Sequence, residues 1–110
     1  MGLVKSELFK SKQNDLAVIF KALAHPARIA IIDYLLKVES CICSDIVNEL
    51  PLAQPTISQH LKELKSAGII KGTIEGTSIC YCVDPKVIKQ LQAYLNAVDV
   101  RLEKQKENCC

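Results

Sequence analysis

The chain has 110 residues, of which 49% are hydrophobic and 24% are charged, and its formal net charge at pH 7 is +2. This length and composition predict one folded domain over residues 1–110 and exclude a disordered chain. The weak positive charge permits nucleic-acid binding but does not argue for it, so a motif must carry that claim. Neither a signal-peptide core nor a membrane-length apolar segment occurs, which predicts a cytoplasmic protein with no membrane partner.

The first part of the chain predicts two successive helices. Residues 1–11 form an N-terminal arm, and apolar residues at helical spacing over 12–24 predict an amphipathic first helix. Pro26 opens a second helix over about 26–37, because proline at the first helical position loses no hydrogen bond. That helix is apolar almost all round, so we expect it to be the core helix. His25 is interpreted as a helix-start residue rather than a ligand.

The middle of the chain predicts a helix, a turn, a helix and a hairpin. A short helix over 44–50 is followed by the turn "PLA" and by a second helix that begins at Gln54 and ends before Gly68. Residues 69–83 alternate between apolar and polar side chains around Gly76-Thr77, which predicts a two-stranded β-hairpin.

The last helix carries a long apolar stripe. Asp84 is expected to cap this helix and Pro85 to open it, and residues 104–110 form a charged tail. A stripe on a terminal helix favours packing against a partner helix, and the alternative is packing on its own domain. The stripe consists of Ile88, Leu91, Leu95, Val98 and Leu102.

This order of elements predicts a mainly α (α+β) fold, a winged helix-turn-helix of about five helices with a two-stranded wing. The fold favours double-stranded DNA as the partner, with amide, hydroxyl and imidazole groups bonding to base edges and lysines to phosphates. The alternative is an ordinary solvated helix face. The candidate DNA-binding residues are Gln54, Thr56, Ser58, Gln59, His60, Lys62 and Lys65 on the second helix of the motif, and Lys71 and Thr77 on the hairpin.

Three segments, "KALAHPARIAIIDYLL", "QPTISQHLKELKSAGII" and "EGTSICYCVD", resemble the ArsR/SmtB family of metalloregulatory repressors, and the resemblance extends from about residue 14 to 100. It implies a non-enzymatic homodimer, paired through the first and last helices, that binds a palindromic operator without a cofactor and is released by an inducer. The implied interface consists of Leu16, Phe20, Ile88, Leu91, Leu95, Val98 and Leu102.

Six cysteines are present, and in a reducing cytoplasm metal binding or redox sensing is favoured over a disulfide framework. Cys41 and Cys43 resemble the Cys-x-Cys pair of arsenic-sensing members of the family. In those members Asp follows the pair directly, whereas here Ser44 intervenes before Asp45. A site built on this segment alone is therefore not expected.

The hairpin offers a second Cys-x-Cys pair. If Ile79, Tyr81 and Val83 face the core, strand alternation places Cys80 and Cys82 together on the opposite face. The extended segment over 40–43 commonly lies beside the second wing strand in such folds, so four sulfurs would converge. The predicted metal ligands are Cys41, Cys43, Cys80 and Cys82, with Cys109 and Cys110 as secondary candidates.

All-sulfur ligation selects thiophilic ions, with As(III) as first choice and Zn(II) or Cd(II) as the other candidates. A thiol-redox or persulfide-responsive repressor that uses the same cysteines is the main alternative. Buried structural cysteines, a zinc-scaffolded interaction module and a small redox enzyme are the remaining interpretations. The enzyme is disfavoured because no Cys-x-x-Cys motif occurs.

Overall fold

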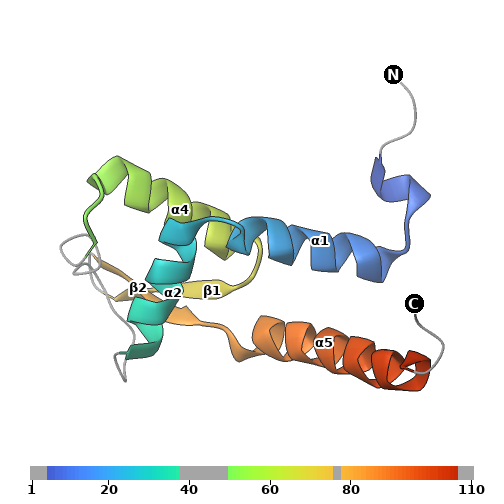
Figure 1. Cartoon of the computed structure of the whole chain (residues 1–110). Coiled ribbons are helices and arrows are strands. Elements are labelled where there is room, and N and C mark those ends of the chain that lie inside the picture. Colours follow the sequence, from blue (N-terminus) through green and yellow to red (C-terminus); the bar gives the residue numbers. More distant parts are fainter. Residues whose placement is uncertain (1–4, 38–49, 76–77, 107–110) are drawn as a thin grey trace.

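The computed structural model describes residues 5–37, 50–75 and 78–106 (Figure 1). The mainly α fold with a β-hairpin is confirmed, and the described elements lie close to their expected positions. The short helix expected over 44–50 lies outside the described residues except for Leu50. In chain order the elements are η1 (Lys5–Leu8), α1 (Ser11–Leu23), α2 (Pro26–Lys37), α4 (Gln54–Ser66), β1 (Ile70–Glu75), β2 (Ser78–Val83) and α5 (Pro85–Gln105).

Helix α1 is amphipathic and buries one face. The side-chain oxygen of Gln13 accepts a hydrogen bond from the backbone N–H of Lys10 at 3.1 Å, which satisfies one of the free donors at the helix start. The buried residues of α1, which are Leu16, Ile19 and Ala22, recur every three positions. This spacing places them on one side of the helix, where they pack toward the core.

Helix α2 contributes Ile31, Ile32 and Leu35 to the core. The sequence suggested burial almost all round, but Ile29 is 44% exposed and Leu36 is 65% exposed. The expectation was therefore correct for one face only, because the described neighbours of this helix, α1, α4 and β2, do not surround it.

Helix α4 ends in a Schellman motif at Gly68. The backbone N–H of Gly68 donates to the Lys65 carbonyl and that of Ile69 to the Leu64 carbonyl, both at 3.0 Å. Gly68 has φ +79°, a left-handed conformation that glycine adopts without steric cost. Leu64 and Ile69 are both fully buried, so an apolar contact accompanies the turn. The chain is thereby turned from the helix directly into β1.

The antiparallel hairpin of β1 and β2 is called the wing below. Its register pairs Ile70 with Val83 at the base and Glu75 with Ser78 near the tip. The backbone N–H of Asp84 donates to the Ile69 carbonyl at 2.8 Å, which extends the pairing to the point where β2 leaves the sheet. The wing packs on α4 through β1 and on α2 through β2.

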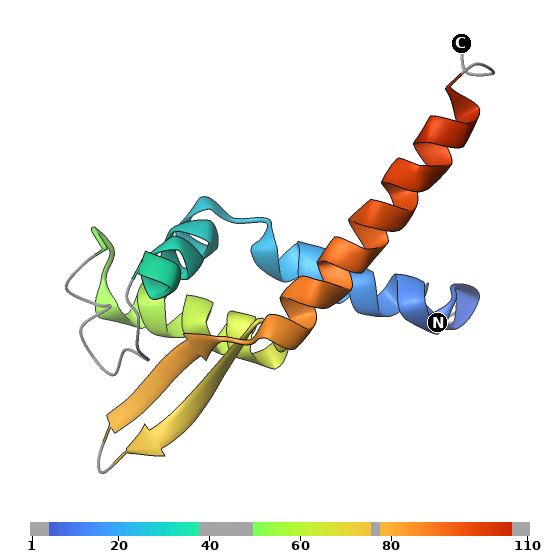
Figure 2. The ribbon, with the colours of Figure 1, turned by 90° about the horizontal axis from the view of Figure 1, so that it is seen from below.

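Helix α5 begins as the sequence indicated, with the Asp84 carboxylate accepting a hydrogen bond from the Lys86 backbone N–H at 3.0 Å. None of its 21 residues is buried. Figure 2 shows why, because its C-terminal half projects away from the body of the domain, opposite to the wing. The core instead lies where α1, α2, α4 and the base of the wing meet.

Candidate nucleic-acid interface

Helix α4 presents one apolar and one polar face. Ile57, Leu61 and Leu64 are at most 5% exposed and fix the helix on the core. The polar residues on its other sides are exposed, as a DNA-contacting helix requires. This exposed set contains six of the residues singled out from the sequence: Gln54, Thr56, Ser58, Gln59, Lys62 and Lys65.

Gln59 is oriented by a neighbour on the same helix. Its Nε2 donates a hydrogen bond to the Glu63 Oε1 at 3.0 Å. One N–H and the carbonyl oxygen of the amide remain to bond with a base edge, since an amide has two donors and an acceptor. Glu63, which was not among the residues selected from the sequence, therefore orients the Gln59 amide.

His60 does not lie on the exposed face of α4. Its side chain is 8% exposed, and its Nδ1 accepts a hydrogen bond from the Arg28 Nε at 3.0 Å. The expectation that His60 lies on the outward, DNA-facing side of α4 is therefore wrong. The physical reason is helical spacing, because position 60 comes three residues after Ile57 and four before Leu64, on the apolar side.

The wing carries one predicted residue, Lys71, at its surface, and another predicted residue, Lys65 of α4, lies close to the wing. Lys71 is exposed on β1, whereas Thr77 lies outside the described residues. Gly72 leaves a narrow space over the strand: an added Cβ would lie 3.1 Å from the Ile79 side chain and 3.6 Å from the Lys65 Nζ. The Lys65 amine of α4 therefore lies over β1 of the wing at Gly72.

Strand β2 differs from expectation in two respects. Ile79 is 44% exposed, so its assignment to the core face is wrong, whereas Cys80 is 1% exposed. Tyr81 and Val83 do pack against the core, but Ile79 lies nearer the wing tip, beyond the edge of the core. Both Cys80 and Cys82 are disulfide-bonded, which differs from the expected free thiols.

Only part of the predicted four-sulfur site lies within the described residues. Its other members, Cys41 and Cys43, lie outside the described residues, as do Cys109 and Cys110. Over the described ranges, no group of three or more His, Cys, Asp or Glu side chains is placed to hold a metal ion. Of the donor set, Cys80 is enclosed by protein and Cys82 is only partly covered.

The apolar stripe of α5 is largely uncovered. Ile88, Leu95 and Leu102 are 39%, 55% and 57% exposed, and Leu91 and Val98 are half-buried. Phe20 of α1 meets the ring of Tyr94 edge-on within the same chain, at a centroid distance of 6.3 Å. Leu16 is 6% exposed in its own protomer, so it offers little surface to a partner.

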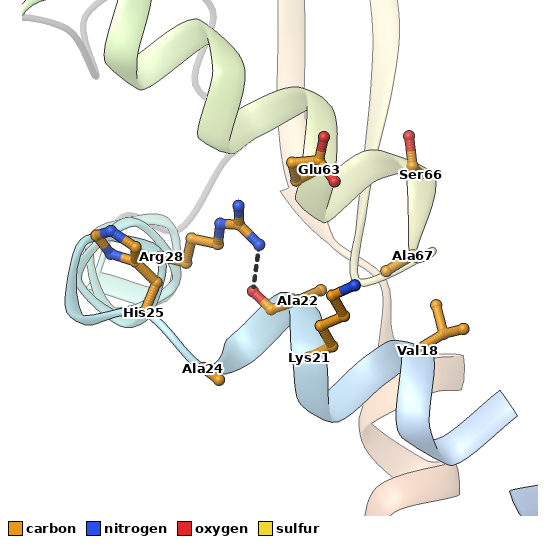
Figure 3. Close-up of a pocket in the computed structure, with 9 residues that line it drawn as sticks. All are labelled: Val18, Lys21, Ala22, Ala24, His25, Arg28, Glu63, Ser66 and Ala67. Carbon is orange, nitrogen blue, oxygen red and sulfur yellow. Dashed lines mark hydrogen bonds between the residues drawn. The ribbon is translucent and has the colours of Figure 1, made fainter. Parts of the chain in front are cut away.

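A pocket of about 440 Å³ lies where the end of α1, the start of α2 and the end of α4 meet (Figure 3). Four of its lining residues are polar and ionisable: Lys21, His25, Arg28 and Glu63. The Arg28 Nη1 donates to the Ala22 carbonyl at 3.2 Å, a bond drawn in Figure 3. His25 caps α2, as the sequence indicated, because its Nδ1 accepts from the Ala27 backbone N–H at 3.0 Å.

Sequence reasoning did not select Arg28, which contacts both α1 and α4 through its side chain. The signal was present in the sequence, since Arg28 interrupts an otherwise apolar run at the start of α2. A charged side chain in such a run needs partners when it is partly buried.

In the part of the chain that the structure describes, no helix combines the length and apolarity needed to cross a bilayer.

Comparison with known proteins places this geometry in a family. Residues 25–71 match the family described as bacterial regulatory protein, arsR family. The chain is 46% identical over 78 residues to an uncharacterized HTH-type transcriptional regulator of Methanocaldococcus jannaschii, covering 69% of this chain and 86% of that protein. It is 37% identical over 100 residues to a cadmium resistance transcriptional regulatory protein CadC homolog of Staphylococcus aureus, covering 87% of this chain and 81% of that protein.

A solved structure shares the fold. The solution structure of a homodimeric winged helix-turn-helix DNA-binding domain from Mycobacterium bovis, a possible ArsR-family transcriptional regulator, superposes with a TM-score of 0.66 at 24% identity. The match covers 96% of this chain and 94% of that domain. The exposed polar face of α4, the wing beside it and the similarity to these proteins all indicate the same family. The chain belongs to the ArsR family of bacterial regulatory proteins and is a DNA-binding, winged helix-turn-helix transcriptional regulator rather than an enzyme.

Proposed function

We propose that this protein is a homodimeric transcriptional repressor that is released from a palindromic operator by a thiophilic metal or metalloid. The observation that carries the proposal is the arrangement of α4, whose apolar face is buried while its polar face is open beside the wing. Operator binding would take place in the cytoplasm through α4 and Lys71, without a cofactor. The DNA contacts would come from Gln54, Thr56, Ser58, Gln59, Lys62 and Lys65.

Dimerisation is supported by the surface of α5. A 21-residue helix without a buried residue is unusual in a small domain, and its apolar stripe is continuous. The similar domain from Mycobacterium bovis is described as homodimeric. A dimer would cover Leu95 and its stripe neighbours and present two α4 helices to two half-sites.

The inducer would bind cysteine sulfur. Cys80 and Cys82 lie two residues apart on β2, so both side chains leave the strand on the same face. With Cys41 and Cys43 they would supply three thiolates to As(III), or four to Zn(II) or Cd(II) in a tetrahedron. Soft sulfur donors fit these ions, and the Staphylococcus aureus relative is named for cadmium resistance. Arsenite remains the first candidate because Cys41 and Cys43 resemble the pair of arsenic-sensing members.

The position of these cysteines supports coupling to DNA. Cys82 pairs across the wing with Lys71, and the neighbouring Gly72 lies beneath the Lys65 amine of α4. A ligand that draws β2 toward another segment would therefore shift the wing relative to α4. Release requires only that the inducer prefer the DNA-free arrangement, and a preference of about 3 kcal/mol weakens binding more than a hundredfold.

A second candidate signal is thiol oxidation. It is favoured by one observation, the disulfide-bonded state of Cys80 and Cys82. In that case oxidation, or a persulfide donor, would switch the protein, and a metal would bind only the reduced form. The zinc-scaffolded interaction module is a weaker alternative, since it does not need the open polar face of α4.

The test is DNA binding in the presence of each inducer. The reduced protein is bound to a labelled duplex from upstream of its own coding region, and the anisotropy is followed while arsenite, zinc, cadmium or a persulfide donor is added. We expect arsenite to release the DNA, with an affinity loss of about a hundredfold. Release by the persulfide donor alone would establish the redox signal instead.

Two variants identify the ligands. Cys80→Ala combined with Cys82→Ser should bind DNA normally and lose the response; alanine is used at position 80 because that site is buried. The matched control removes Cys109 and Cys110 and should respond as the wild type does. If the shortened chain loses the response and the double variant keeps it, the site involves the tail, and the role proposed for β2 is wrong.

A further inference from the structure

The side chain of Arg28 joins three helices below the DNA-contacting surface. It starts on α2, its Nε donates to the His60 Nδ1 of α4 at 3.0 Å, and its Nη1 donates to the Ala22 carbonyl of α1 at 3.2 Å. These contacts lie beside the pocket shown in Figure 3. His60 lies on the inner side of the helix whose outer side carries Gln59. A change at His60 therefore acts directly on the orientation of α4.

The His60 imidazole must be unprotonated on Nδ1. The His60 Nδ1 accepts from Arg28, and the His25 Nδ1 accepts from the Ala27 backbone N–H at 3.0 Å. A nitrogen that accepts a hydrogen bond carries no proton, so the His60 ring is in its neutral form with the proton on Nε2. Protonation of His60 at Nδ1 would turn two donors toward each other and break the bond to Arg28.

The surrounding charges oppose protonation of His60. The His25 ring is 4.4 Å from the His60 ring, and Arg28 is bonded to it. Lys21 of α1 lines the pocket that also contains His25 and Arg28, and on β1 the charged side chain whose exposure is described, Lys71, is exposed. The nearby opposite charge among the described residues is Glu63 of α4, whose carboxylate also accepts from Gln59.

We infer that Arg28 and a neutral His60 act together as positioning residues that hold α4 in its DNA-binding orientation. The inference rests on the proposal that α4 contacts the operator. It goes beyond that proposal by making operator binding sensitive to pH at a place remote from the cysteines and from the DNA. Neither residue would touch the nucleic acid.

The direction of the pH effect follows from the pKa of His60. Burial lowers this pKa below the ordinary value of 6.5, and the charges of His25 and Arg28 lower it further. The neutral ring is thus favoured while the bond to Arg28 is intact, and a ring released from it takes up a proton more readily. The contribution of the neutral ring to the stability of the folded protein is complete above pH 6.5. It is lost as the pH falls from 6.5 through the lowered pKa of His60.

A general electrostatic effect would have the opposite sign. Protonated histidines add positive charge to the protein, and positive charge strengthens binding to phosphates. Affinity for a non-specific duplex should therefore stay constant or rise as the pH falls. A decrease restricted to the operator would identify loss of the orientation of α4.

The experiment measures operator and non-specific binding of the full chain at a series of pH values between about 5.5 and 8, which brackets the ordinary range of histidine. For the wild type we expect operator affinity to fall as the pH drops through the pKa of His60 in the free protein, which lies below 6.5, by at most tenfold per pH unit for one proton. His60→Asn places the amide oxygen near the position of Nδ1 and does not titrate. It should bind at pH 8 and lose this decrease, whereas His60→Leu should bind weakly at every pH.

His25→Asn is the matched control. Asparagine is a good N-cap and can accept from the Ala27 N–H, so helix α2 should be preserved. Removal of the second imidazole takes away one cause of the lowered pKa, and the pH at which operator affinity falls should move upward. Circular dichroism at each pH would show whether a variant remains folded.

A measurement on the wild type alone completes the test. The pKa of His60 is followed by NMR in the free protein and in the operator complex. If DNA requires the neutral ring, the pKa must be lower in the complex, although nearby phosphates alone would raise it. An equal or higher pKa in the complex, or a His60→Asn profile identical to the wild type, overturns the inference. Absence of operator binding at pH 8 would instead overturn the proposed function.

Discussion

Gln59 and Lys62 lie on neighbouring turns of the exposed face of α4 and offer different chemistry to DNA. The Gln59 amide is held by Glu63 and keeps a donor and an acceptor for a base edge. Lys62 carries a flexible point charge that suits phosphates, which are the same at every sequence. The two residues should therefore separate specificity from general affinity.

Substitution of each residue by alanine tests this division. Gln59→Ala should weaken operator binding by about 1–3 kcal/mol and reduce discrimination at one base position. Lys62→Ala should weaken all duplexes alike and lower the salt dependence of binding by about one ion. The measurement is anisotropy with operator and scrambled duplexes at several salt concentrations.

Lys12→Ala is the matched control for Lys62, because it removes the same charge from an exposed position at the start of α1. It should leave operator affinity and its salt dependence nearly unchanged. If Lys12→Ala and Lys62→Ala weaken binding equally, the effect comes from net charge, and α4 has no special role.

Individual residues were also where prediction from the sequence was least secure. His60 is polar, and polarity suggested the exposed face, but its helical position and its bond to Arg28 place it inside. Ile79 was assigned to the core face together with Tyr81 and Val83, but it is exposed because it lies nearer the tip of the wing, beyond the edge of the core. Such cases depend on partners that are distant in the sequence.

Among the elements, α5 has the clearest unsatisfied surface. Leu95 is 55% exposed and lies in the middle of the apolar stripe. In a dimer it would be covered by a partner helix, where an unpaired charge is strongly unfavourable. In the isolated protomer the same charge would remain in water and cost little.

Leu95→Glu should therefore separate the subunits without unfolding them. Sedimentation velocity should show a monomer, circular dichroism an unchanged helix content, and anisotropy a loss of operator affinity. Ala93→Glu is the matched control, since Ala93 is exposed on α5 and lies on the opposite side by helical spacing. A dimer that persists in Leu95→Glu, or dissociates equally in Ala93→Glu, would show that the stripe is not the interface.

The elements themselves were predictable because their ends carry strong local signals. Pro26 and Pro85 lie at helix starts, Asp84 forms the expected cap, and Gly68 has the left-handed conformation that ends α4. These features depend on residues close in sequence. The exposure of Ile29 and Leu36 on α2 could not be read in this way, because it depends on which neighbours pack there.

The whole molecule is less compact than its length suggests. Its radius of gyration is 17.3 Å, whereas a compact domain of this length is expected near 13 Å. Figure 2 shows that the C-terminal half of α5 and the wing project in opposite directions from the body, which enlarges this radius. A projecting helix with an exposed apolar stripe and a projecting wing are the surfaces through which a protomer would meet a partner and DNA.

Net charge alone would not direct this molecule to DNA. A charge of +2 is small, so binding must come from the local arrangement of α4 and the wing. In a two-fold dimer these surfaces occur twice, and two half-sites about one helical turn apart follow from that symmetry.

DNase I footprinting of the DNA upstream of the coding region tests the repressor function most directly. We expect the reduced protein to protect two inverted half-sites whose centres are about 10 base pairs apart, or a multiple of that distance. Protection should disappear when arsenite is added and persist when arsenite is added to the variant that lacks both Cys80 and Cys82. The absence of any protected region, or protection that no thiol-binding reagent removes, would contradict the proposed function.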